Sequence, residues 1–426
     1  MKRHLIGIGG VGMSALATAL VRLGDEVTGA DRTLGTPNIK FLESLGVKVY
    51  PDDGSGVDKS TDEVIVSTAI EETNAGLIKA KGFGIPVTHR AKALSRTLKD
   101  YKLVAVVGTC GKSTVTAMLG HVLAECGLDP MCVNGANVPG WEGAVRFGKG
   151  EYAVAEVDES DKSLVAFKPY AAIVTNASAD HYSKEEMDEV FDAFVKDCEG
   201  PVIDGREGSK SSRGSRGLRG EDVPLPGHHN FQNAELAVSM AIALGVEPEK
   251  AIAAMRTFHG VERRLQLVSS QTSRTSRTFQ TSAPAVYDDY AHNPEKLKAM
   301  WTTLAEKHPD GICVIWRPHG YAPLRKMMDA LAEMFAETVR PCDKLLLLPV
   351  YDAGGTTDRS VNSDDLKKRM QAIEQSNNPN NRTILIPDLD AAYDWCVAHK
   401  GDFAAFVTCG ARDPGLPVLA KRLSEM

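Results

Sequence analysis

The chain has 426 residues, of which 43% are hydrophobic and 25% charged, and its formal net charge is −7. This composition suits a soluble enzyme with two or three cores, and the acidic balance gives no support for a nucleic-acid partner. No apolar stretch approaches the roughly 18 residues of a membrane helix, so no membrane partner is expected. The eight cysteines form no C-x-x-C pair, which indicates free thiols in a reducing cytoplasm.

The first block, residues 1–99, alternates strand and helix patterns. The strand LIGIG leads into a G-x-G-x-x-G turn at Gly7, Gly9 and Gly12, then an apolar helix and a second strand that ends at Asp31. Glycines at this spacing let the backbone approach a diphosphate, and an acid at this distance is typical of dinucleotide-binding folds. The basic, apolar start superficially resembles a signal sequence, but its glycines favour a first β-strand. The same loop serves any ligand that presents a diphosphate, so the ligand stays open at this point.

The second block, residues 100–268, carries the most informative motif. An apolar run precedes the segment GTCGKST, and an apolar helix pattern follows it. Gly108 and Gly111 let the loop turn its N–H groups toward an anion, to which the helix N-terminus adds positive potential. Lys112 can reach the β- and γ-phosphates, and the Ser113 hydroxyl can contact Mg²⁺. The loop is one residue shorter than the common phosphate loop, yet the strand–loop–helix context predicts ATP use.

Acids and a histidine follow the phosphate loop at predicted strand ends. Glu156 and Asp158 end one strand pattern, and His181 follows another. Oxygen and imidazole ligands beside a phosphate loop suit Mg²⁺, which takes few protein ligands. Residues 205–222 are rich in Gly, Ser and Arg and are expected to form a mobile loop. A helix with a clear apolar face is predicted over 230–244.

The third block, residues 269–426, begins with a Ser/Thr/Arg-rich insert and then alternates strand and helix patterns. This alternation predicts a doubly wound α/β domain, whose functional groups lie at the carboxyl ends of its strands. The candidates at those ends are Asp288, Asp289, His292, Arg317, His319, Asp352, Arg412 and Asp413.

The segments HLIGIGGVGMSALA, GTCGKST, AEVDESDKS, GHHNFQNAELA, GVERRLQ and DDYAHNP together resemble the Mur ligase family, in that family's order and over nearly the whole chain. The resemblance implies a three-domain α/β architecture. A Rossmann-like domain would hold a UDP-sugar, a central P-loop ATPase domain with a shortened insert would hold ATP, and a C-terminal Rossmann-like domain would contribute to ATP and amino-acid binding. The implied reaction is ATP-dependent amide-bond formation through an acyl phosphate, which joins L-alanine to UDP-N-acetylmuramate in peptidoglycan precursor synthesis.

The resemblance also assigns residues. The implied catalytic residues are Lys112, Glu156, His181 and Arg264, and the implied Mg²⁺ ligands are Ser113, Glu156 and His181. The implied ATP contacts are Gly108, Thr109, Cys110, Gly111, Lys112, Ser113, Thr114, His229, Asn230, Asn233, Asp289 and His292. The implied substrate contacts are Gly9, Gly12, Met13, Ser14, Asp31, Ser67, His319 and Arg412. Arg264, with Arg263 as the alternative, would touch the γ-phosphate when the third domain swings inward around residues 263–268.

Other interpretations stay open. A murein-peptide recycling ligase would attach a tripeptide to the same nucleotide sugar, although the loop GIGGVGMS favours the alanine-adding type. An NAD-dependent dehydrogenase would explain the first glycine loop but not residues 108–114, and a scaffold that has lost catalysis is a further alternative. The segment RPHGYAPLR matches the family's Q-P-H-R-Y only in part, Cys110 stands where a histidine is common, and residues 182–226 lack room for the family's extra sheet. The partners expected are small-molecule substrates, and the chain is expected to be a monomer or homodimer.

Overall fold

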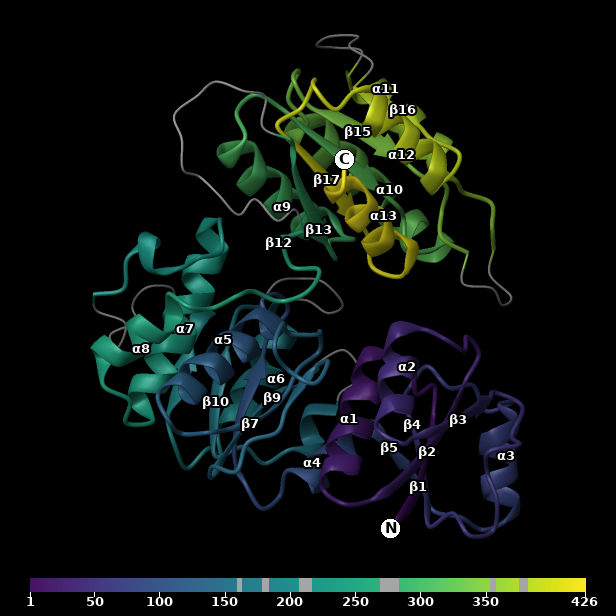
Figure 1. Cartoon of the computed structure of the whole chain (residues 1–426), viewed down its shortest axis with the longest axis vertical. Helices are drawn as coiled ribbons and strands as arrows, with labels where there is room; N and C mark the ends of the chain where they lie inside the picture. The colour runs from purple at the N-terminus through teal and green to yellow at the C-terminus, as the bar shows by residue number, and fades with distance from the viewer. Residues whose placement is uncertain (159–162, 178–183, 207–216, 269–282, 353–357, 375–381) are drawn as a thin grey trace. The chain divides into compact units, whose positions relative to one another are not determined.

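The computed structural model describes the whole chain except residues 159–162, 178–183, 207–216, 269–282, 353–357 and 375–381. The chain forms two compact units: Met1–Pro224 with His229–Val261, and Leu225–His228 with Glu262–Met426. The described residues form three β-sheets with flanking helices (Figure 1). The α/β fold class predicted from the sequence is therefore confirmed. No helix among the described residues is long and apolar enough to cross a bilayer.

The first sheet is parallel and has the order β3-β2-β1-β4-β5. Its elements are β1 (Lys2–Ile6), α1 (Val11–Arg22), β2 (Glu26–Asp31), α2 (Pro37–Ser44), β3 (Lys48–Pro51), β4 (Glu63–Val66), α3 (Ala75–Gly82), β5 (Val87–His89) and α4 (Arg90–Thr97). The chain proceeds to one side of β1 through β2 and β3 and then returns to its other side with β4. Loops that leave β1 and β4 therefore border the point where the strand order reverses, which is where such sheets bind ligands.

The second sheet, also in the first unit, has the order β11-β10-β6-β9-β7-β8. Its elements are β6 (Lys102–Val107), α5 (Lys112–Glu125), β7 (Met131–Val133), β8 (Val145–Arg146), β9 (Tyr152–Glu156), β10 (Ala171–Val174), α6 (Lys184–Val195), β11 (Val202–Asp204), α7 (His228–Ala243) and α8 (Pro248–Met255). Among the described strands of this sheet, β8 is the one that pairs antiparallel, with β7. Of the segment expected as a loop, residues 207–216 lie outside the described residues, and a 3-10 turn covers Gly220–Asp222.

These two sheets share one hydrophobic core. Leu16 and Leu20 of α1 belong to the same buried cluster as Leu94 of α4 and Ala153 of β9. α1 is therefore buried on the first sheet and also contributes to the core of the second. Burial of apolar surface stabilises a fold by roughly 25 cal/mol per Å². The apolar side chains that the two sheets share therefore hold them together as one compact unit.

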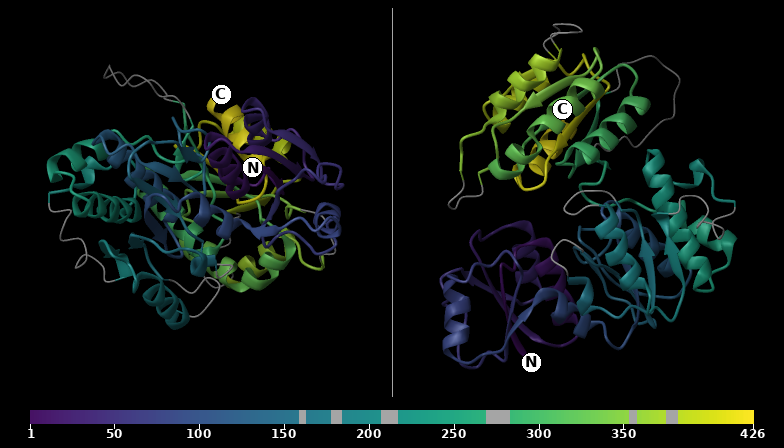
Figure 2. Two further views of the ribbon diagram at one scale, coloured as in Figure 1. Left: turned by 90° about the horizontal axis from the view of Figure 1, so that it is seen from below. Right: turned by 180° about the vertical axis from the view of Figure 1, so that it is seen from behind.

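The third sheet, in the second unit, has the order β12-β13-β17-β14-β15-β16. Its elements are β12 (Gln266–Leu267), β13 (Ala285–Asp289), α9 (Pro294–Lys307), β14 (Ile312–Trp316), α10 (Tyr321–Thr338), β15 (Lys344–Leu347), α11 (Ser363–Glu374), β16 (Thr383–Leu385), α12 (Leu389–Ala398), β17 (Ala405–Cys409) and α13 (Gly415–Ser424). Helices cover both faces, as the views in Figure 2 show.

The side-chain alternation of β14 explains this doubly wound arrangement. Val314 and Trp316 pack in the cluster that includes α9, α10 and α11, whereas Cys313 and Ile315 pack in the cluster with α12 and α13. Successive residues of a strand point to opposite faces, and an apolar residue at every position therefore requires cover on both.

The segment before β13 belongs to the third sheet. β12 pairs antiparallel with β13, so that Gln266 lies opposite Asp288, and the division between the compact units falls between Val261 and Glu262. Residues 263–268, where the sequence analysis expects the third domain to pivot, therefore belong to the second unit, and the pivot itself stays a prediction.

Candidate active site

The loop between β6 and α5 has the backbone of an anion cradle. Gly108 has φ +129° and Gly111 φ +83°, in a region that disfavours residues with a Cβ. A Cβ on Gly108 would collide with the Thr175 hydroxyl, and one on Gly111 would lie 2.6 Å from Asn233 Oδ1. Among the residues that the structure describes, no side chain caps the N-terminus of α5, and the first turn of this helix has no acid. The N–H groups and positive helix end are thus arranged for a negatively charged ligand.

The end of β10 holds this loop, a role that the sequence analysis missed. Asn176 Oδ1 accepts from the Thr109 hydroxyl at 2.6 Å and from the Cys110 N–H at 3.0 Å. The Cys110 carbonyl accepts from Thr175 Oγ1 at 2.6 Å and from Asn176 Nδ2 at 3.0 Å. Neighbouring β6 and β10 bring these groups together. In the sequence, the polar pair Thr175-Asn176 directly after an apolar strand pattern could have indicated this role.

Lys112, Ser113 and Thr114 form the first turn of α5. Lys112 Nζ donates to the Gly108 carbonyl at 2.6 Å, so the lysine side chain folds back along its own loop. Ser113 and Thr114 are buried. The lysine charge therefore lies against the loop itself, and its contact with a phosphate stays a prediction.

Glu156 ends β9, the strand next to β6, and its carboxylate is held from β7. The N–H of Gly135 donates to Glu156 Oε2 at 2.8 Å. A Cβ at Gly135 would lie 2.6 Å from Oε1 and from Cδ of Glu156, closer than side chains pack. Position 135 therefore requires glycine, because the Cβ of any other residue would displace the Glu156 carboxylate. The sequence analysis did not identify Gly135.

The donor set fits Mg²⁺, which prefers a carboxylate or hydroxyl together with phosphate oxygens. Ser113 in the loop and Glu156 at the adjacent strand end supply such oxygens. His181, the third expected ligand, lies outside the described residues. Within the described ranges, no three His, Cys, Asp or Glu side chains gather in a way that could hold a metal ion.

α7 brings two of the expected ATP contacts to the same unit. Asn230 and Asn233 are buried in its first two turns, and the side chain of Asn233 lies directly against Gly111. His229 is half-buried beside them. Asn233 therefore lies at the phosphate loop, and the contact of this helix with ATP stays a prediction.

The glycine loop after β1 is closed by Asp31. The Gly9 N–H donates to Asp31 Oδ2 at 2.8 Å, and Asn38 Nδ2 donates to the Gly9 carbonyl at 3.0 Å. A Cβ on Gly12 would lie 3.2 Å from an Arg90 guanidinium nitrogen, so a positive charge stands beside the start of α1. Asn38 and Arg90 were not among the residues expected from the sequence.

The other expected residues of the first sheet lie in different surroundings. Met13 and Ser14 are buried in α1, and the Ser14 hydroxyl donates to the Val11 carbonyl at 2.9 Å. Ser67 is half-buried directly after β4, on the other side of β1. The strand order therefore places Ser67 and the glycine loop at the same edge of the sheet.

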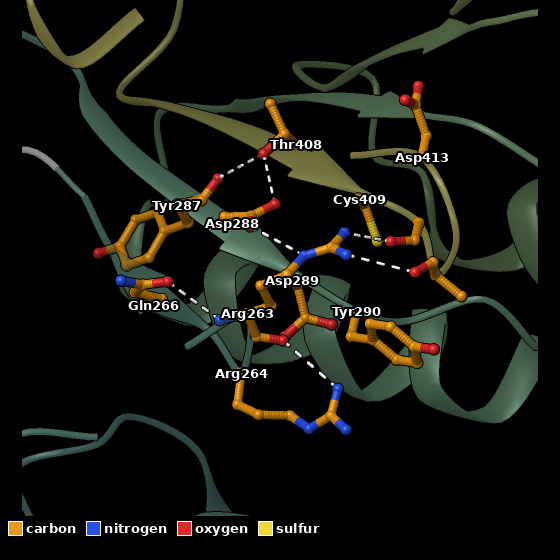
Figure 3. Close-up of polar contacts among 12 residues, drawn as sticks. Arg263, Arg264, Gln266, Tyr287, Asp288, Asp289, Tyr290, Thr408, Cys409 and Asp413 are labelled. Atoms are coloured by element: carbon orange, nitrogen blue, oxygen red, sulfur yellow. Dashed lines mark hydrogen bonds and ion pairs between the residues drawn. The ribbon is translucent and has the colours of Figure 1, made fainter. Parts of the chain in front are cut away.

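In the second unit, the carboxyl ends of β13 and β17 form a dense polar cluster (Figure 3). Asp288 Oδ1 accepts from Thr408 Oγ1 at 2.7 Å, and its Oδ2 accepts from Arg263 Nε at 3.1 Å. Burial raises the pKa of Asp288 to about 6, and the nearby charge of Arg263 counteracts that rise. Burial likewise raises the pKa of Asp289, against the charge of Arg264.

His292 and His319 meet above the same sheet. Their rings lie 4.8 Å apart with edge-to-face geometry, and His292 Nδ1 lies 2.9 Å from the Tyr290 carbonyl. Arg317 forms an ion pair with Asp413, whereas Arg412 is exposed. Of the other expected strand-end groups, Asp352 forms an ion pair with Arg359 at 2.7 Å.

Comparison with known proteins defines the class. The description "Mur ligase family, catalytic domain" matches residues 2–102, and "Mur ligase, glutamate ligase domain" matches residues 263–412. The chain belongs to the Mur ligase family, as the sequence motifs indicated.

Particular relatives span the whole chain. The UDP-N-acetylmuramate–L-alanine ligase of Rubrobacter xylanophilus is 32% identical over 455 aligned positions, covering 97% of each chain. The ligase of the same name from Desulforamulus reducens is 30% identical and covers 100% of this chain and 98% of the relative. UDP-N-acetylmuramate-alanine ligase MurC from Thermotoga maritima shares the fold, with a TM-score of 0.80 at 24% identity over 100% of this chain and 98% of that one. The murein peptide ligase of Psychrobacter arcticus gives a TM-score of 0.65 at 21% identity, over 99% and 98% of the two chains.

Proposed function

We propose that this chain is an ATP-dependent, ADP-forming ligase that joins L-alanine to UDP-N-acetylmuramate in peptidoglycan precursor synthesis. Its full-length relatives of this name support that assignment. The observation that supports the ligase assignment best is the arrangement of residues at one edge of the second sheet. This edge presents the glycine cradle with Lys112 after β6 and the carboxylate of Glu156 at the end of the adjacent β9.

The first step is phosphoryl transfer. A carboxylate oxygen of the sugar substrate attacks the γ-phosphorus of ATP, the bond to the β-phosphate oxygen breaks, and ADP leaves. Lys112 and the N–H groups of its loop neutralise charge that develops on the transferring group, and Arg264 would add a further positive charge. Mg²⁺, held by Ser113, Glu156 and His181, would supply Lewis-acid stabilisation of the phosphate oxygens.

The second step forms the amide. The amine of L-alanine attacks the carbonyl carbon of the acyl phosphate, a proton leaves the nitrogen, and inorganic phosphate departs. Water competes with the amine at this stage, so the site must exclude it. His319 and Arg412 are the residues proposed to hold the amino acid, and Asp289 and His292 to contact ATP.

The UDP-sugar is proposed to bind at the first sheet. The uncapped start of α1 and the Arg90 guanidinium beside Gly12 favour a diphosphate. Because ATP and a nucleotide sugar are its substrates, we also propose the cytoplasm as its compartment and small molecules as its main partners, with the chain acting as a monomer or homodimer.

A phosphate-release assay tests the function. Purified protein is given ATP, Mg²⁺ and UDP-N-acetylmuramate with a panel of amines, which includes L-alanine, glycine, L-serine and a murein tripeptide. We expect phosphate release with L-alanine and a product whose mass equals the two substrates less one water. Efficient release with the tripeptide alone would instead identify a recycling ligase, and no release with any amine would refute the ligase assignment.

A further inference from the structure

Arg263 is held on the third sheet by its whole guanidinium group. Nε donates to Asp288 Oδ2 at 3.1 Å, one terminal nitrogen donates to the Ala411 carbonyl at 3.3 Å, and the other donates to the Gly410 carbonyl (Figure 3). Asp288 is 1% exposed. The charge of Arg263 is thus directed into the domain and is satisfied there, at the carboxyl ends of β13 and β17.

The backbone on both sides of Arg264 is fixed as well. The Tyr290 N–H donates to the Arg263 carbonyl at 2.8 Å, and the Leu265 N–H donates to Asp289 Oδ2 at 2.6 Å. Arg263 and Leu265 have φ values of +58° and +47°. Residues other than glycine adopt this region at a cost, and they keep it only where surrounding contacts determine the backbone.

Between these anchored residues, the Arg264 side chain takes a different course. Its guanidinium lies 4.7 Å from the centre of the Tyr290 ring. The Arg263 guanidinium lies over the same ring, at 5.3 Å from its centre. The two arginines differ in their hydrogen bonds: Arg263 is bound to a buried carboxylate and two carbonyls, whereas Arg264 donates only to the Arg263 carbonyl, at 3.5 Å, among the bonds of the described residues.

We propose that Arg263 is a positioning residue, which clamps the chain to β13 and β17 and so presents the Arg264 guanidinium to the transferring phosphoryl group. The clamp at Arg263 rests on the described contacts, whereas the role of Arg264 rests on the function proposed above. Charge stabilisation of a phosphoryl group depends on a guanidinium that is already oriented, and a displacement of about 1 Å can cost ~10²-fold in rate. Lysine cannot replace Arg263, because a single ammonium cannot reach the carboxylate and both carbonyls as the planar fork does.

Two variants test the proposal, Arg263→Gln and Arg263→Lys. The control is Arg422→Gln, in the same unit. Arg422 forms an ion pair with Asp390 at 2.7 Å, and its guanidinium lies 4.2 Å from the centre of the Tyr393 ring. Amide hydrogen exchange is measured without ligands, and kcat and KM are measured by phosphate release. We expect faster exchange at Leu265 and Tyr290 in both Arg263 variants, with the β14 and β15 amides unchanged. We further expect kcat to fall about 10- to 100-fold while KM for UDP-N-acetylmuramate stays within about twofold.

The results separate the clamp from the proposed function. Unchanged exchange at Leu265 and Tyr290 would overturn the clamp. Faster exchange with kcat within about twofold of the parent would show that Arg263 fixes the segment but does not position Arg264 for phosphoryl transfer, and would overturn the proposed positioning role. If the parent releases no phosphate with any amine, the proposed function fails, and the exchange experiment still decides whether Arg263 fixes the segment. Should Arg263→Gln not fold because Asp288 is left buried and unpaired, the double variant Arg263→Gln/Asp288→Asn carries no unpaired charge and is measured instead.

Discussion

Gly135 offers a direct test of whether Glu156 is the catalytic carboxylate. A methyl group at this position would lie 2.6 Å from Oε1 and Cδ of Glu156, whereas ordinary contacts begin at 3.4 Å. Because Oε2 would lie closer still, the carboxylate in Gly135→Ala must withdraw by about 1 Å. A misplacement of about 1 Å at a reacting centre can lower turnover by ~10²-fold, and we expect a loss of that order in kcat.

The assay is phosphate release with saturating ATP and UDP-N-acetylmuramate, at a series of Mg²⁺ concentrations. The half-saturating Mg²⁺ concentration should rise, because the displaced carboxylate can no longer contribute a ligand oxygen in its original position. The Michaelis constant for UDP-N-acetylmuramate should stay near that of the parent, since the first sheet is untouched.

Gly82→Ala is the matched control. This glycine ends α3, a Cβ on it would meet nothing within 4 Å, and its φ is not in the left-handed region. The control should keep parental kcat and gain slightly in thermal stability, because alanine is the better helix former by up to about 1 kcal/mol. If Gly135→Ala retained parental turnover and Mg²⁺ dependence, the assignment of Glu156 to the metal site would be refuted.

Three further predictions concern single residues. Lys112→Ala should lower turnover ~10²- to 10³-fold, through loss of a transition-state charge contact. Its unfolding midpoint should fall only modestly, since a single hydrogen bond from the ammonium to the Gly108 carbonyl is lost and such a bond is worth about 1.5–3 kcal/mol; near-parental turnover would show that this loop is not the ATP site. Glu156→Ala and His181→Ala should each raise the Mg²⁺ requirement while sparing UDP-sugar binding, measured by calorimetry, and lost sugar binding with normal Mg²⁺ dependence would contradict the assignment. The pKa of Asp288 is raised from 3.8 to about 6, so the folded state retains a proton that the unfolded state releases, and stability should fall as pH rises through that window. Asp288→Asn should remove this fall, about 3 kcal/mol, from thermal unfolding followed between pH 4 and pH 7, and an unchanged profile would count against the buried carboxyl.

The sequence alone located the chemistry that depends on local spacing. Gly108 directly follows β6 and Gly111 directly precedes α5, and both glycines have a positive φ in the structure. Such a loop is specified by residues that are neighbours along the chain, because glycine conformation and the helix end are local properties. The alternation of apolar runs with helical patterns likewise predicted parallel sheets, which pairing of β1, β2 and β4 confirms.

Strand order could not be read in this way. The contact of Asn176 with Cys110 joins residues 66 positions apart, and that of Gly135 with Glu156 joins residues 21 apart. Both arise because β10 and β9 flank β6 and β7 lies beside β9. β7 spans only Met131–Val133, too short for a periodic pattern to predict, so the glycine that follows it carried no visible signal.

Arg263 and Arg264 show most clearly what the sequence could not determine without the tertiary structure. The motif alone placed both arginines in the linker and could rank them only by resemblance. In the fold, pairing of β12 with β13 fixes this segment on the second unit, where the Asp288 carboxylate and the carbonyls of Gly410 and Ala411 bind one guanidinium. Those acceptors come from strands 25 to 148 residues away along the chain. Residue type fixed the charge of each arginine, and only the meeting of distant strand ends determined which of the two is bound to the buried Asp288 carboxylate.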